Sequence, residues 1–122
     1  MDMRLELVPL PVTDVDRSKS FYVELVGFVL DHDVQPGNGM RVVQLTPPGS
    51  ACSIVIGVGI SEPGAAPVKG IHLVVDDIEA TRTELASRGV DVSEVSHMGG
   101  GVSYAYFSDP DGNSWALQQI AR

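Results

Sequence analysis

The chain has 122 residues, a length that fits one domain with a real hydrophobic core. Its 16 Asp and Glu residues outnumber its 8 Lys and Arg residues and are spread over both halves, so no basic face is expected and nucleic acids and anionic membrane surfaces are excluded as partners. The single cysteine, Cys52, excludes an internal disulfide, and the lack of a long apolar run or a signal-like start favours a cytoplasmic protein without a membrane partner.

The first half of the chain predicts one strand, one helix and three further strands. A strand is expected over about 4–12, and Pro9 and Pro11 each remove a ladder donor from it, which favours a position at a sheet edge. Asp14 is typical of a helix N-cap, and Gly27 is typical of the residue that ends a helix. The strands predicted after this helix cover 28–33, 41–46 and 51–57.

The second half repeats this pattern. Asp77 and Gly89 bracket a second predicted helix that follows another apolar run. The strands predicted after it cover 90–95, 102–107 and 114–120. A segment rich in Gly, Pro and Ala separates the copies. The sequence therefore predicts a single domain, 1–122, with one βαβββ module at about 1–60, a linker at about 61–69 and a second module at about 70–122.

Two segments carry a resemblance to a known family. "LPVTDVDRSKSFYVELVGF" near the N-terminus and "FSDPDGNSWAL" near the C-terminus are similar to the opening and closing motifs of the vicinal oxygen chelate superfamily. This group includes glyoxalases, bleomycin-resistance proteins and extradiol dioxygenases. The resemblance implies an α+β fold in which paired βαβββ modules form curled mixed sheets that enclose a cleft. It also implies a homodimer, which the proline-marked edge strand favours as well.

The metal ligands of the family are missing from this sequence. Metalloenzymes of the family place one His, Gln or Glu on each of four strands. Carried over one by one, these positions fall at Leu7, about Val55, Gly70 and Ala116. None of these side chains is a metal donor. The resemblance therefore implies a member without the usual metal site, and we expect no metal and no cofactor.

Polar residues next to these positions are candidate ligand contacts. Side chains two residues apart share a strand face, so His72 lies on the face of Gly70 and Gln118 on the face of Ala116. His72 fits a general base or a hydrogen-bonding group for a ligand, and the alternative is a pocket-wall histidine bonded to a neighbour. Gln118 offers a donor and an acceptor to a ligand, or satisfies neighbouring sheet groups instead.

Three further residues stand out from apolar strands. Gln44 is polar between two apolar neighbours, which indicates either one polar contact inside an apolar cleft or a position facing solvent. Tyr104 and Tyr106 share a strand face, where their rings would stack on a planar ligand or pack in a core or interface. The shape of the pocket is expected to depend on the loops 35–40 and 97–101.

These observations leave the function open between classes. The first hypothesis is a metal-independent small-molecule binding protein that sequesters a planar or largely apolar drug or metabolite through His72, Gln118, Gln44, Tyr104 and Tyr106. The alternative is a glyoxalase-like lyase or isomerase with a rearranged active site, in which His72 and Gln118 would be the catalytic residues. A small regulatory or interaction module is a third reading.

Overall fold

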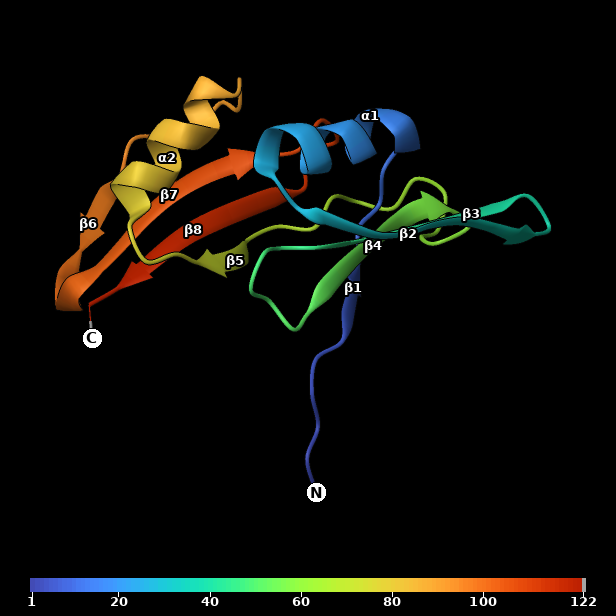
Figure 1. Cartoon of the computed structure of the whole chain (residues 1–122), viewed down its shortest axis with the longest axis horizontal. Coiled ribbons are helices and arrows are strands. Elements are labelled where there is room, and N and C mark those ends of the chain that lie inside the picture. Colours follow the sequence, from blue (N-terminus) through green and yellow to red (C-terminus); the bar gives the residue numbers. More distant parts are fainter. Residues whose placement is uncertain (122) are drawn as a thin grey trace. The chain divides into compact units, whose positions relative to one another are not determined.

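The computed structural model describes residues 1–121, and the chain divides into two compact units. The first unit ends at Pro67 and the second begins at Val68, inside the segment predicted as a linker. Each unit contains one four-stranded sheet with one helix (Figure 1). None of the helices among residues 1–121 has the length and apolar character needed to span a bilayer.

The first unit has a strand, a helix and three strands. Its elements are β1 (Leu7–Pro9), α1 (Val15–Ser20), the π-helical turn η1 (Phe21–Val26), β2 (Val29–Gly37), β3 (Met40–Thr46) and β4 (Ser53–Val58). The strand order is β1-β4-β3-β2, with β1 parallel to β4 and the other neighbours antiparallel. The predicted edge position of the proline-containing strand is confirmed.

Strand β1 is shorter than the predicted range of 4–12. Its partner β4 begins only at Ser53, whose N–H donates to the carbonyl of Glu6 at 2.9 Å, so the residues before Glu6 have no strand opposite them. The first residues extend away from the sheet (Figure 1). The Leu10 N–H still donates to the Val55 carbonyl at 3.0 Å, so Pro9 and Pro11 lack N–H groups on the outer side of the strand, away from β4.

The first helix begins and ends where the sequence predicts. The Asp14 side chain accepts a hydrogen bond from the Arg17 N–H at 3.1 Å, and Gly27 ends the helical segment with a φ of 93°. The last turn is wider than an α-helical turn, and the N–H groups of Gly27 and Phe28 both donate to the Tyr22 carbonyl. This turn buries the Tyr22 ring completely, stacked on Phe28 at 5.4 Å between centroids.

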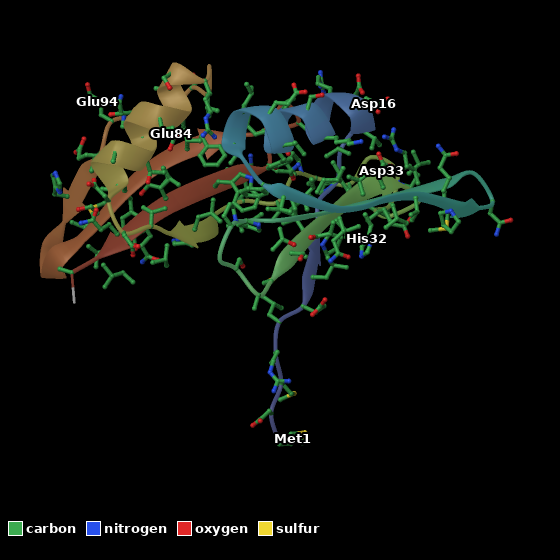
Figure 2. All side chains as sticks on the ribbon, viewed as in Figure 1. Met1, Asp16, His32, Asp33, Glu84 and Glu94 are labelled. Carbon is green, nitrogen blue, oxygen red and sulfur yellow. The ribbon has the colours of Figure 1, made fainter. Side chains whose placement is uncertain are left out.

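An ion-pair cluster ties this helix to the sheet. Asp33 on β2 accepts hydrogen bonds from the Arg41 guanidinium at 3.0 and 2.9 Å and from Lys19 Nζ at 2.7 Å. Arg41 also pairs with Asp16 at the start of α1, and Figure 2 shows Asp16 and Asp33 on the helical side of β2, with His32 on the other side. The bonds from Arg41, and then from Lys19, hold the pKa of Asp33 well below its usual range.

The predicted loop 35–40 is wrong in part. Strand β2 continues to Gly37, which pairs with Met40, so only Asn38 and Gly39 form the turn. Both turn residues have a positive φ, 54° and 72°, as the two central residues of a type I′ hairpin turn require. The hairpin therefore extends both strands beyond their predicted ends.

The second unit repeats the topology of the first. Its elements are β5 (Ile71–Val74), α2 (Ile78–Ser87), β6 (Ser96–Met98), the 3-10 turn η2 (Gly99–Gly101), β7 (Val102–Ser108) and β8 (Ser114–Ile120). The strand order is β5-β8-β7-β6, again with one parallel pair, β5 and β8. The predicted α+β fold with a repeated βαβββ order is confirmed.

The second helix has the predicted caps. The Asp77 side chain accepts from the Ala80 N–H at 3.0 Å. At the other end, the N–H of Val90 donates to the Leu85 carbonyl, and Gly89 takes a φ of 98°, which is the pattern of a Schellman motif. The start of the helix lies over β8, since the Ile78 N–H donates to Gln119 Oε1 at 2.7 Å.

The strand predicted over 90–95 is wrong. Val90 and Val92 are buried in alternation, as in a strand, but the ladder with β7 is interrupted beside them. The hydroxyl of Ser93 accepts the Tyr106 N–H at 2.9 Å, a hydrogen that a backbone carbonyl would accept in a regular ladder. Regular pairing with β7 starts only at β6, so strand structure replaces part of the predicted loop 97–101.

The core of the second unit lies between its sheet and α2. Trp115 is 1% exposed, and its ring stacks on Phe107 at 6.1 Å between centroids. Trp115 shares its face of β8 with Leu117 and with Gln119, which bonds the start of α2. The covered face of this sheet therefore carries the odd-numbered residues of β8, and the even-numbered residues form the opposite, open face.

Candidate functional site

Four of the five predicted ligand contacts lie on the open face of the second sheet. On β8, Ala116 pairs with His72 of β5 on one side and with Tyr106 of β7 on the other. Gln118, two residues further along β8, pairs with Tyr104. Since paired residues in neighbouring strands share a face, these side chains form one group, which we call the aromatic face: His72, Tyr104, Tyr106 and Gln118.

The side chains of the aromatic face contact one another. Gln118 Nε2 donates a hydrogen bond to the Tyr104 hydroxyl oxygen at 3.1 Å. The His72 ring meets the Tyr104 ring edge-on, with centroids 5.8 Å apart and planes at 87°. The rings of Tyr104 and Tyr106 are nearly parallel, with centroids 6.1 Å apart. The face thus combines two aligned tyrosine rings with four polar groups, which are the His72 imidazole, the two tyrosine hydroxyls and the Gln118 amide.

Much of this face is exposed within the chain. His72 is exposed, Tyr106 is 46% exposed, and Tyr104 and Gln118 are half-buried. Val74 of β5, which pairs with Gln118, is 58% exposed and adds apolar surface to the same face. Exposed aromatic and aliphatic side chains that surround a few polar groups are typical of a ligand-binding surface.

The orientation of His72 is fixed by the backbone. Its Nδ1 lies 2.7 Å from the Gly70 carbonyl oxygen. A carbonyl oxygen only accepts, so Nδ1 carries the hydrogen and Nε2 of the neutral ring keeps its lone pair. Gly70 is held in turn, because its N–H donates to Ser114 Oγ at 2.8 Å. The alternative role of His72, a histidine bonded to a neighbour, therefore holds for Nδ1. Its Nε2 remains available to accept a hydrogen bond from a ligand.

Gln44, the fifth predicted contact, lies in the first unit. It is half-buried on β3, and its Nε2 lies 3.4 Å from the Ser53 hydroxyl oxygen. Ser53 Oγ is 2.6 Å from Thr46 Oγ1, and Thr46 also donates to the Asp31 carboxylate. Gln44 therefore starts a chain of polar side chains on the open face of the first sheet.

The sequence analysis missed the partners of Gln44. Thr46 ends β3 and Ser53 begins β4, and short polar residues are usual at strand ends. The signal that could have identified Thr46 is its spacing of two residues from Gln44, which places both side chains on one face. Ser53 could not be found in this way, because its position depends on the register between β3 and β4.

The positions at which the family carries metal ligands are occupied by apolar residues or glycine. Leu7 and Val55 lie on β1 and β4 of the first sheet, and Ala116 lies on the aromatic face. Gly70 directly precedes β5. Within residues 1–121, no group of three or more His, Cys, Asp or Glu side chains lies close enough together to hold a metal ion. The expected lack of a metal stays a prediction.

Each unit has a hollow on its surface. The hollow in the second unit, of about 350 Å³, lies beside β7 at positions that β6 does not reach. Its lining consists of Asp91, Ser93, Tyr106, Phe107, Ser108 and Ser114. Because Tyr106 belongs to both, this hollow adjoins the aromatic face. The hollow in the first unit, of about 310 Å³, lies at the β2–β3 hairpin and contains none of the predicted contacts.

Comparisons with known proteins agree on one family. A family model described as the Glyoxalase/Bleomycin resistance protein/Dioxygenase superfamily matches residues 4–117. The chain is similar to the crystal structure of TnmS3, an antibiotic binding protein from Streptomyces sp. CB03234, with a TM-score of 0.85 and 37% identity over 98% of each chain.

Two further structures show the same similarity. A glyoxalase/bleomycin resistance protein from Streptomyces sp. CB03234 is 38% identical, with a TM-score of 0.80 over 95% of this chain and 100% of that one. A member of the Glyoxalase/bleomycin resistance protein/dioxygenase superfamily from Sphaerobacter thermophilus DSM 20745 is 30% identical, with a TM-score of 0.84 over 97% and 98% of the two chains.

Proposed function

The chain belongs to the Glyoxalase/Bleomycin resistance protein/Dioxygenase superfamily, and we propose that within it the protein binds a small molecule, a drug or metabolite, without a metal ion. The observation that carries this proposal is the aromatic face, where His72, Tyr104, Tyr106 and Gln118 contact one another on one open sheet surface. The similarity to an antibiotic binding protein over 98% of each chain supports the same class of function.

The chemistry of this face favours a planar and largely apolar ligand. The near-parallel rings of Tyr104 and Tyr106 provide flat apolar surface, and Val74 extends it. The polar atoms beside the rings, on His72 and Gln118, would orient the ligand through hydrogen bonds. Few polar anchors within an apolar surface are the usual composition of a small-molecule site.

A second candidate function is a glyoxalase-like lyase or isomerase with a rearranged site. The available Nε2 of His72 favours it, because a neutral imidazole with a free lone pair is suited to accept a proton from a bound substrate. Gln118 would then hold a substrate oxygen. Turnover that His72→Ala abolishes, while the ligand still binds, would support this candidate over simple binding.

We further propose that the protein is a cytoplasmic homodimer. The free edge of β1 and the exposed side chains of Leu5 and Leu7, 70% and 37% exposed, support association with a second copy. Sedimentation at micromolar concentration tests the dimer, and monomer alone would contradict it.

Calorimetric titration of variants tests the proposed binding function. The first step is to find, among aromatic antibiotics and metabolites, a compound that raises the melting temperature of the protein. We expect His72→Ala and Gln118→Ala each to weaken its binding by about 1 to 3 kcal/mol, roughly fivefold to a hundredfold, because each removes a hydrogen bond from a partly desolvated contact.

The control is Thr83→Ala, at an exposed position of α2. It is expected to leave both affinity and stability unchanged. Unchanged affinity in both the His72 and the Gln118 variants, for a compound that binds the parent protein, would contradict the assignment of these residues to the site.

A further inference from the structure

The hydrogen bonds within the aromatic face leave one acceptor and one donor unused. His72 Nδ1 donates to the Gly70 carbonyl, so Nε2 is an acceptor. The Tyr104 hydroxyl oxygen accepts from Gln118 Nε2, so the hydrogen of that hydroxyl is free to donate elsewhere. Neither group has a further partner among the described residues.

These two unused groups lie on neighbouring rings. The His72 and Tyr104 rings meet edge-on, with centroids 5.8 Å apart. A ligand that covers the rings of Tyr104 and Tyr106 also removes water from both polar groups. Each would then be desolvated without a partner, which costs binding free energy unless the ligand replaces the lost hydrogen bonds.

A single hydroxyl group offers both the donor and the acceptor that these two groups lack. Its hydrogen donates to His72 Nε2, and its oxygen accepts from the Tyr104 hydroxyl. A ketone or an ether offers only acceptors, so it leaves Nε2 unpaired, and a carboxylate adds a charge to a chain whose net charge is −8. An aromatic ring that carries the hydroxyl directly fits the flat apolar surface beside it.

We propose that the ligand of the aromatic face is a phenol-type compound, a planar aromatic ring system whose hydroxyl group bonds both His72 Nε2 and the Tyr104 hydroxyl. This inference rests on the proposed binding function and names the chemistry of its ligand. In addition to the ligand contact proposed above, Gln118 positions Tyr104, because its amide N–H donates to the Tyr104 oxygen and leaves the Tyr104 hydrogen for the ligand.

The tautomer of His72 tests the inference without any ligand. In the ¹⁵N-labelled protein, two-bond ¹H–¹⁵N spectra at pH 8 should show the neutral His72 ring with its hydrogen on Nδ1. A neutral ring with its hydrogen on Nε2 would overturn the inference, since Nε2 would then be a donor, and would leave the proposed binding function standing.

Matched probes test the ligand chemistry. We expect 2-naphthol to bind at least about fivefold more tightly than 2-methoxynaphthalene, which has the same ring and oxygen but no hydrogen to donate. In His72→Phe, which keeps an aromatic ring and removes the acceptor, this preference should disappear. In the control His97→Phe, an exposed histidine on β6, the preference should remain.

The outcomes separate the two proposals. Equal affinities of the two probes, with shifted signals of Tyr104 and Tyr106, would overturn the phenol assignment and support binding at the aromatic face. If neither probe shifts the Tyr104 and Tyr106 signals at millimolar concentration, the phenol assignment is overturned, and the proposed binding function is decided by the titration of aromatic antibiotics and metabolites.

Discussion

The two halves of this chain share a topology, but the open faces of their sheets carry different residues. Both sheets have one parallel strand pair and the same strand order, and both helices begin at an Asp whose side chain caps the helix. Val55 on β4 corresponds to Ala116 on β8. Gln44 pairs with Val55 in the first sheet, whereas Tyr106 pairs with Ala116 in the second. The caps and the strand order therefore fix the fold, and the open-face residues distinguish the two surfaces.

The turns that precede the last strand of each half also differ, in their burial and in their hydrogen bonds. In the second half, Asp109 Oδ1 accepts from the N–H groups of Asp111 and Asn113, and its Oδ2 accepts from Asn113 Nδ2. In the first half, the corresponding turn is held by the exposed Ser50. The turn of the second half is therefore held by hydrogen bonds between the buried residues Asp109 and Asn113, whereas the turn of the first half is exposed.

The largest loss of stability is expected for a substitution in the buried turn of the second half. Asn113 is completely buried, and its Oδ1 also accepts from the Val68 N–H at 2.9 Å. Asn113→Ala removes the hydrogen bonds of this buried side chain to the Val68 N–H and to Asp109, and should lower the free energy of unfolding by about 3 kcal/mol. Ser50→Ala, at the exposed turn, should cost under about 1 kcal/mol. Urea unfolding measures both, and equal losses would contradict the difference between the turns.

An intermediate effect is expected at the ion-pair cluster of the first half. Asp33→Asn removes a carboxylate that bonds both Arg41 and Lys19, and it should cost about 1 to 2 kcal/mol. Glu84→Gln breaks the exposed pair with Arg88 in the second half and should cost under about 0.5 kcal/mol. Urea unfolding at pH 7 measures both, and similar losses would show that the cluster does not distinguish the two halves.

The same cluster predicts the pH dependence of stability. The pKa of Asp33 in the folded protein lies well below its value in the unfolded chain, so the unfolded state binds a proton first as the pH falls. The stabilisation by Asp33 is therefore complete at neutral pH and is lost below roughly pH 4. The loss of stability on acidification should be smaller in Asp33→Asn than in the parent. Parallel acid profiles for the two proteins would contradict this.

The smallest effect is expected for the residue that distinguishes the open faces. Tyr106→Gln gives the second sheet the residue that the first has at the same place. Because Tyr106 is 46% exposed, stability should change by under about 0.5 kcal/mol, while loss of the ring should weaken ligand binding by about 1 kcal/mol, roughly fivefold. Calorimetry and urea unfolding separate the two effects. A loss of stability without a loss of affinity would make Tyr106 a structural residue.

Local signals in the sequence predicted most of the fold. Asp14 and Asp77 cap the helices, and Gly27 and Gly89 follow their ends, because capping and positive φ angles depend on a few adjacent residues. The hairpin turn also had such a signal, the Asn38-Gly39 pair, which the prediction overlooked.

Other features depend on contacts between distant residues. The alternation of Val90 and Val92 indicated a strand, but the bond from Tyr106 to the Ser93 hydroxyl interrupts the ladder, and that bond requires the register of two segments. The same limit applies to the site. The two-residue spacing placed His72 on the face of Gly70 and Gln118 on the face of Ala116. Only the pairing of β5, β7 and β8 shows that both side chains share one face with Tyr104.

The central claim is that the aromatic face of the second sheet holds the ligand. A crystal structure of the protein with the compound that most raises its melting temperature tests this claim most directly. The account predicts ligand density in contact with His72, Tyr104 and Gln118. Density in the hollow at the β2–β3 hairpin, lined in part by Gln35 and Arg41, with the aromatic face empty, would contradict it.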